Sequence, residues 1–222
     1  IVARSPDDRD AGLQLSTNYT TLGEYLMQRD MSAASAQQAL DSFEKGLALL
    51  QRLSDKNPLN TALARHVAVT RDSIGSCLLR LHKPGDAVAQ HQRALQIMNE
   101  LVAKDPASTT FRIDQAGISG ALSEALRAAG DVQGAVAAAR TAVGGFDALP
   151  PNALQESDTR YRQALSRFQL GDALLTAKQR PAACETYRQA LPMFEALEKE
   201  LGDTGAGNVQ AATVREAIKR CE

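Results

Sequence analysis

The chain has 222 residues, of which 44% are hydrophobic and 4% aromatic, and its 25 basic and 26 acidic side chains leave a formal net charge of −1. A chain of this length can bury a core, which must consist largely of leucine and alanine because aromatic residues are scarce. Binders of nucleic acid or anionic membranes normally carry a basic excess, so the charge balance argues against both partners. No apolar run of the sequence reaches membrane-spanning length, and we expect no membrane contact by this segment.

The three cysteines, Cys77, Cys184 and Cys221, lie far apart in the sequence and lack the spacing of metal ligands. Their odd number and wide separation predict three reduced thiols, which favours a cytoplasmic location. The three histidines also lack a cysteine or carboxylate at metal-ligand spacing. We therefore expect no metal site and no cofactor.

An internal repeat of 48 residues runs through the chain. Apolar or small residues recur at this interval in several columns, for example Leu53, Leu101, Leu149 and Leu197, or Ala39, Ala87, Ala135 and Ala183. The first copy has four additional residues between Leu26 and Ala39. Within a copy the apolar residues are spaced by three and four, which places them on one face of a helix. Each copy is thus predicted to be a pair of helices that must stack on its neighbours to cover its apolar faces.

In chain order, residues 1–6 align with the end of the later copies, and we expect them to be the remnant of a preceding repeat. Four helix pairs follow at about 7–58, 59–106, 107–154 and 155–202. The first helix of the first pair is predicted at about 9–29, and the second helices at about 36–56, 84–104, 132–149 and 181–200. Residues 208–221 are predicted to form a single capping helix, because Val214 and Ile218 continue the apolar spacing.

The fourth copy resembles the tetratricopeptide repeat (TPR) family. It has Leu170-Gly171-x-x-Leu174 and then Ala183-x-x-x-Tyr187-x-x-Ala190, and the other copies keep this pattern loosely, with Gly23, Gly75 and Ser123 at the small position. The resemblance covers nearly the whole chain and implies an all-α, TPR-like α-solenoid, a right-handed superhelix of stacked antiparallel helix pairs. The family repeat has about 34 residues, so each helix here is longer by about seven residues. That extension is about 10 Å.

The long, alanine-rich repeats that end in L-V-A-K-D-P at residues 101–106 also resemble the repeats that follow the kinase domain in some bacterial eukaryotic-type Ser/Thr kinases. This resemblance implies a protein-interaction scaffold in a larger signalling protein, either cytoplasmic or on the extracytoplasmic side of a membrane-anchored kinase. The chain has no kinase motifs, and no nucleophile, base and orienting group can be assembled, so we expect no catalysis here. The alternative is an intracellular peptide-sensing domain attached to a DNA-binding or other effector domain.

The TPR resemblance further implies that the first helix of each pair lines a concave groove for a partner peptide or helix. Counting from the small residue of each first helix predicts the groove residues Thr20, Glu24, Met27, Asp72, Ser76, Leu79, Glu124, Arg127, Phe168, Asp172 and Leu175. Carboxylates beside an apolar strip suit a basic-amphipathic segment. The alternative is that the acids only keep an empty surface soluble.

Two further expectations concern partners. The positions at which chaperone-binding TPR domains hold a carboxylate are Thr20, Glu24, Ser73, Gly117 and Ala121 in this chain, and none is basic, which excludes that role. The first predicted helix should expose apolar surface that a preceding repeat would cover. Self-association through that face is therefore possible.

Overall fold

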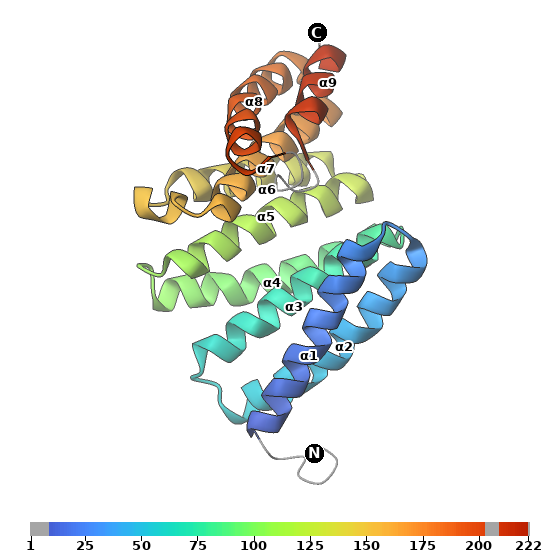
Figure 1. The fold of residues 1–222 in the computed structure, drawn as a ribbon, viewed down its shortest axis with the longest axis vertical. Coiled ribbons are helices and arrows are strands. Elements are labelled where there is room, and N and C mark those ends of the chain that lie inside the picture. Colours follow the sequence, from blue (N-terminus) through green and yellow to red (C-terminus); the bar gives the residue numbers. More distant parts are fainter. Residues whose placement is uncertain (1–8, 203–208, 222) are drawn as a thin grey trace. The chain divides into compact units, whose positions relative to one another are not determined.

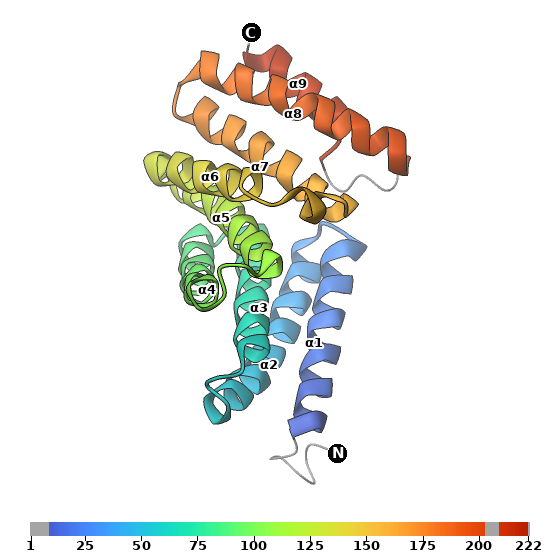
Figure 2. The same ribbon diagram turned by 90° about the vertical axis from the view of Figure 1, so that its left-hand side faces the viewer.

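The computed structural model describes residues 9–202 and 209–221, and within these ranges it contains helices and no strand (Figures 1 and 2). The α-helices are α1 (Arg9–Arg29), α2 (Ala33–Lys56), α3 (Thr61–Arg80), α4 (Pro84–Lys104), α5 (Thr109–Ala129), α6 (Val132–Asp147), α7 (Ser157–Thr176), α8 (Arg180–Leu201) and α9 (Ala211–Cys221). A 3-10 helix, η1 (Pro151–Leu154), follows α6. The all-α fold class is confirmed, and each predicted helix is present with its ends shifted by a few residues. Residues 1–6 and the start of the expected capping helix lie outside the described ranges.

The helices begin where the sequence provides caps. Asn60 and Ser108 accept hydrogen bonds from the backbone N–H groups three residues later, at 3.1 and 3.4 Å, and so start α3 and α5. Pro84 occupies the first turn of α4, where its missing N–H leaves no hydrogen bond unmade. At the other end of α5, Gly130 has a φ of 89° and closes the helix in the left-handed conformation. Local chemistry therefore fixes these boundaries.

The chain divides into two compact units, Ile1–Pro106 and Ala107–Glu222. In the first unit, α1 packs against α2, α2 against α3, and α3 against α4. Phe43, Ile74, Met98 and Leu101 are almost fully buried in its core. These residues belong to the apolar columns of the repeat, so the periodicity places them on the faces that meet.

The second unit repeats this arrangement and adds α9. Here α5 packs against α6, α6 against α7, α7 against α8, and α8 against α9, and α7 also contacts α5. The core gathers around Tyr187, Phe194 and Val214, all with side chains fully buried. Ion pairs join α7 to three other helices of the unit. Arg160 pairs with Glu200 on α8 at 2.7 Å, Arg167 with Asp147 at the end of α6 at 2.5 Å, and Arg162 with Asp114 on α5 at 3.7 Å.

The small residue of each first helix lies where the aromatic position of the second helix approaches. A Cβ atom added to Gly23 or Gly75 would lie 2.7 Å from the Phe43 ring or 2.6 Å from the His91 ring, far inside van der Waals contact. Gly171 meets Tyr187 in the same way. The third copy has Ser123 at the small position and alanine at the aromatic position, and the Ser123 hydroxyl donates to the Ala135 carbonyl at 2.8 Å. A side chain larger than Gly is thus tolerated only where the ring is missing.

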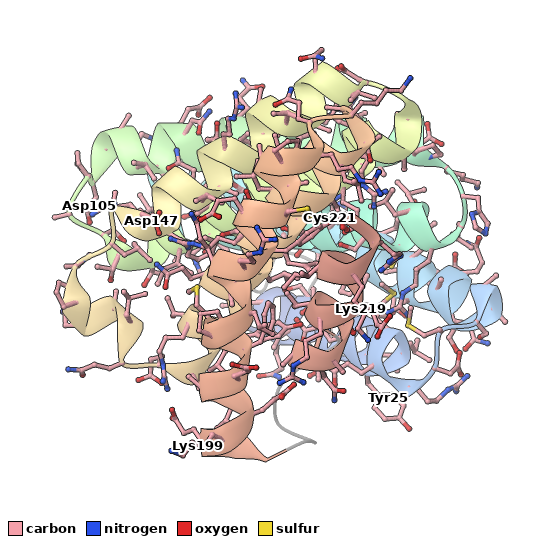
Figure 3. The ribbon with its side chains drawn as sticks, turned by 90° about the horizontal axis from the view of Figure 1, so that it is seen from above. Tyr25, Asp105, Asp147, Lys199, Lys219 and Cys221 are labelled. Carbon is pink, nitrogen blue, oxygen red and sulfur yellow. A yellow bond between two sulfur atoms is a disulfide. The ribbon has the colours of Figure 1, made fainter. Side chains whose placement is uncertain are left out.

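The expectation of three reduced thiols is wrong for two of them. Cys184 and Cys221 form a disulfide between α8 and α9, with Cα atoms 5.6 Å apart (Cys221 is labelled in Figure 3). The backbone N–H of Ala211, at the start of α9, donates to Glu198 near the end of α8 at 2.7 Å. Because α9 then runs antiparallel to α8, its last residue returns to the beginning of α8. The cysteines therefore no longer favour a cytoplasmic location.

Cys77 is the remaining thiol and is fully buried in α3. Burial raises the pKa of this thiol to about 12, so it stays protonated at neutral pH. Within the described part of the chain, no helix has the length and apolar character needed to cross a membrane.

Candidate peptide-binding clefts

Each unit has a cleft beside its two first helices. In the first unit, a cleft of about 240 Å³ opens between α1 and α3, with α2 contributing to its floor. We call it the hydroxyl cleft, and its lining residues are Ser16, Thr17, Thr20, Thr21, Glu24, Phe43, Leu50, Arg65, His66, Val69, Thr70 and Ser73. Its walls are therefore largely hydroxyl-bearing, and its floor is apolar.

The hydroxyl groups of this cleft are oriented by their own helices. Ser16 and Thr17 donate to the Leu13 carbonyl at 2.7 and 3.0 Å, and Thr70 donates to the His66 carbonyl at 2.8 Å. A hydroxyl that donates in this way keeps acceptor lone pairs. The cleft can thus accept hydrogen bonds from a ligand with N–H groups, such as the backbone of an extended peptide.

Charged and titratable groups lie at different positions along the hydroxyl cleft. Glu24 belongs to the last part of α1, whereas Arg65 and His66 belong to the first part of α3. Burial, together with the neighbouring Arg65, lowers the pKa of His66 and favours its neutral form.

Only Thr20 and Glu24 of the groove residues predicted in this unit line the hydroxyl cleft. Asp72 instead accepts a hydrogen bond from Nδ1 of the buried His91 at 2.8 Å. The thioether of Met27 contacts the Cys77 thiol at 3.4 Å, and Ser76 donates to the Asp72 carbonyl at 3.2 Å. Leu79 is partly buried and does not line the cleft.

The hydroxyl cleft is also lined by Ser16, Thr17, Arg65 and His66, which were not predicted from the sequence. They precede the predicted positions by one or two helical turns. The 48-residue repeat could have indicated these residues, because a repeat of this length makes each first helix about two turns longer than in the TPR family. A groove on longer helices has additional positions that family-based counting does not reach.

The second unit has a smaller cleft of about 110 Å³ beside α5 and α7. We call it the acidic cleft, and its lining residues are Ser123, Glu124, Arg127, Leu165, Phe168, Gln169, Asp172 and Val209. It brings together four of the five groove residues predicted in this unit. Leu175 does not line it and packs against the core of the unit.

A hydrogen bond from the buried Tyr187 holds Asp172 in place within the acidic cleft. The Tyr187 hydroxyl donates to Asp172 Oδ1 at 2.6 Å. Burial is the main cause that raises the pKa of Tyr187 above its ordinary value, and this hydrogen bond is the second cause. The Phe168 ring packs on the Tyr187 ring at a centroid distance of 5.6 Å. Glu124 is exposed at the rim. The cleft therefore combines a fixed carboxylate, an exposed carboxylate and an aromatic surface.

Solved structures with similar folds are TPR-like repeat proteins. A kinesin light chain-like protein of Podosopora anserina with nearly identical TPR-like repeats superposes with a TM-score of 0.59, at 14% identity over 95% of each chain. BtubC (BKLC) from P. vanneervenii superposes with a TM-score of 0.51, at 14% identity over 96% of this chain and 89% of that chain. Neither a family model nor a curated protein matches the sequence. The likeness shows the fold, a TPR-like helical repeat solenoid.

Proposed function

We propose that this chain is a non-catalytic protein-interaction scaffold that binds a partner peptide or helix against its first helices. The observation that carries the proposal is the acidic cleft, which gathers Glu124, Asp172 and Phe168 from two first helices. The hydroxyl cleft occupies the comparable place in the other unit. Clefts with an apolar floor and a few oriented polar groups are typical of ligand sites.

The partner segment is basic and amphipathic. Its cations pair with Glu124 and Asp172, while its apolar side chains cover Phe168 and Leu165. Arg127 lies beside the two carboxylates and favours a partner that also carries an acidic or neutral residue next to its cations. Complementary charge of this kind contributes mainly to specificity and to the association rate.

The wider setting that we propose is a larger signalling protein such as a bacterial Ser/Thr kinase, in which four helix pairs form the repeat region and α9 is the cap. The second candidate is a peptide-sensing domain attached to a DNA-binding or other effector domain. The hydroxyl cleft favours this candidate in one respect, because hydroxyl acceptors suit the backbone of a short extended peptide. We propose a cytoplasmic location for this chain. The alternative is the extracytoplasmic side of a membrane-anchored kinase.

The test is binding of a synthetic helix that has arginine on one face and leucine on the other, measured calorimetrically at several salt concentrations. Glu124→Lys should weaken binding by about tenfold and flatten its salt dependence. Asp172→Asn should weaken it as well, since an asparagine can still accept the Tyr187 bond but has lost the charge. The control is Glu185→Lys, the same charge change at an exposed position of α8. Equal effects of Glu124→Lys and Glu185→Lys would contradict the proposed site.

A further inference from the structure

A third cleft, of about 390 Å³, lies in the first unit where the last turns of α2 and α4 meet the first turns of α3. We call it the helix-end cleft. Its apolar lining includes Val67, Ile97 and Leu101, and its charged lining consists of Asp55, Glu100 and Lys104. It shares no lining residue with the hydroxyl cleft. The helix-end cleft is therefore a separate surface of the first unit, which the proposed function does not use.

The third and fourth copies of the repeat carry an arginine where this cleft has Ala64. Ala64 is the fourth residue of α3, and the 48-residue interval leads from it to Arg112 and Arg160, the fourth residues of α5 and α7. Arg112 donates to the Ala148 carbonyl at the end of α6. Arg160 donates through both terminal nitrogens to Glu200, near the end of α8, at 2.7 Å. In both copies an arginine of the first helix thus binds the C-terminal end of the second helix.

The second copy keeps the acceptor end of this interaction but lacks the arginine. Glu100, near the end of α4, aligns with Ala148, whose carbonyl binds Arg112. The C-terminal end of a helix carries a partial negative charge, because its last carbonyl groups have no donor within the helix. Since α2 also ends at this cleft, two helix C-termini contribute negative potential there.

The charged side chains of the helix-end cleft add to this negative potential. Asp55 and Glu100 are exposed, and neither carboxylate forms an ion pair or a hydrogen bond with another described residue. Lys104 contributes one positive charge against these two carboxylates, so the charged lining is negative on balance. A cation from a partner is therefore complementary to this cleft.

The apolar lining favours arginine among the possible cations. Val67 and Leu101 are buried beneath the charged rim. An arginine side chain covers apolar surface with its methylene groups while its guanidinium reaches polar groups. Beside the cleft, Leu59 follows the lining residue Pro58 and is 90% exposed. An apolar residue next to the arginine of a partner can therefore pack on Leu59.

We propose that the helix-end cleft binds an arginine of a partner protein that has an apolar residue beside it. The guanidinium pairs with Glu100 and with the last carbonyl groups of α4, and Asp55 adds to the negative potential. The partner's arginine takes the place that an arginine of the chain itself holds in the third and fourth copies. Because the acidic cleft belongs to the other unit, this proposal and the proposed function succeed or fail independently.

The test uses a capped six-residue peptide of glycine and serine with arginine followed by leucine at its centre. The peptide is titrated to millimolar concentration into the unmodified protein, and backbone amide shifts are followed by NMR. We expect saturable shifts at the lining residues of the helix-end cleft. A peptide with citrulline in place of arginine keeps the shape and loses the charge, and it should bind at least about tenfold more weakly.

The decisive variant is Ala64→Arg, which supplies the cleft with an arginine of its own. It should weaken binding of the arginine peptide at least about tenfold, because the added side chain takes the position of the guest. Ala62→Arg is the matched control, since Ala62 is exposed on the same helix outside the cleft, and binding should be unchanged. Thermal unfolding verifies that both variants fold. Glu100→Gln should also weaken binding and provides a test that does not depend on filling the cleft.

Three results would overturn the proposal. The first is a titration without saturable shifts at the helix-end cleft, including one in which the shifts are confined to the acidic cleft. The second is equal affinity of the arginine and citrulline peptides, or undiminished binding to both Ala64→Arg and Glu100→Gln. The third is tighter binding of a peptide with glutamate in place of arginine, which would assign the cleft to an acidic partner through Lys104.

Discussion

The close approach between Gly75 and His91 leads to a quantitative prediction for Gly75→Ala. The added Cβ would lie 2.6 Å from both Cε1 and Nε2 of His91 and 2.9 Å from its Cδ2. The ring cannot easily turn away, because it is fully buried and its Nδ1 is bound to Asp72 at 2.8 Å. The clash must therefore be relieved by moving α3 and α4 apart.

The size of the effect follows from two opposing contributions. Overpacking a well-packed core by one methyl group typically costs about 1–3 kcal/mol. Alanine in a helix interior recovers about 0.5–1 kcal/mol relative to glycine. We therefore expect Gly75→Ala to lower the free energy of unfolding of the first unit by about 1–2 kcal/mol. Gly85→Ala is the control in the same unit, because no atom lies within 4 Å of its added Cβ, and it should be neutral or slightly stabilising.

The assay is urea unfolding followed by circular dichroism, extended to a double-mutant cycle with His91→Ala. In the His91→Ala background, Gly75→Ala should no longer be destabilising, which gives a coupling energy of about 2 kcal/mol. This double variant imitates the third copy, in which Ser123 accompanies an alanine at the aromatic position. If Gly75→Ala were as stable as Gly85→Ala, or if its cost persisted without the His91 ring, the steric argument would be refuted.

Three further predictions concern the cysteines and the turn between α1 and α2. Replacing Cys184 and Cys221 by serine should lower the stability of the second unit by about 2–4 kcal/mol, and urea unfolding of the unmodified protein with and without a reductant should reproduce the loss. The Cys77 thiol, with its pKa raised to about 12, should react with iodoacetamide at neutral pH only after the protein unfolds. Unfolded protein that has not been reduced should contain one reactive thiol. Fast labelling of the native protein would contradict this prediction. Hydrogen bonds from Ser32 and Ser35 hold the pKa of Asp30 below its ordinary value. Asp30 therefore stabilises the fold above pH 3.8 and loses this effect as the pH falls toward its folded-state pKa. The Asp30→Ala variant should be less stable than the unmodified protein at neutral pH and equally stable in strong acid.

The sequence contained enough information for the fold class and for the positions of the helices. Helix formation and amphipathic faces depend on residues three and four apart, and the 48-residue recurrence displays the same local pattern four times. The recurrence also places a glycine at the small position of three copies, and the structure shows that the Phe43, His91 and Tyr187 rings approach these glycines. Gly75 and His91 pack together because both lie on the faces that the apolar spacing turns inward. Glu124, Phe168 and Asp172 line one cleft of the second unit. Glu124 and Asp172 occupy the same repeat position on α5 and α7, and Phe168 lies one turn before Asp172. Their role in binding a partner stays a prediction.

The tertiary structure decided the contacts that depend on the direction and length of whole helices. Cys184 and Cys221 meet only because α9 runs antiparallel to α8, and no local spacing encodes the direction of a helix after a loop. Asp72 was predicted in the groove but is bound to His91, because a buried imidazole requires a hydrogen-bond partner and the carboxylate is within reach. Ser16 and Arg65 line the hydroxyl cleft because the lengthened first helices extend it beyond the family's positions. Exposure of Tyr25 and burial of the aligned Cys77 likewise depend on whether a neighbouring helix pair is present, which the side chains of one helix cannot determine.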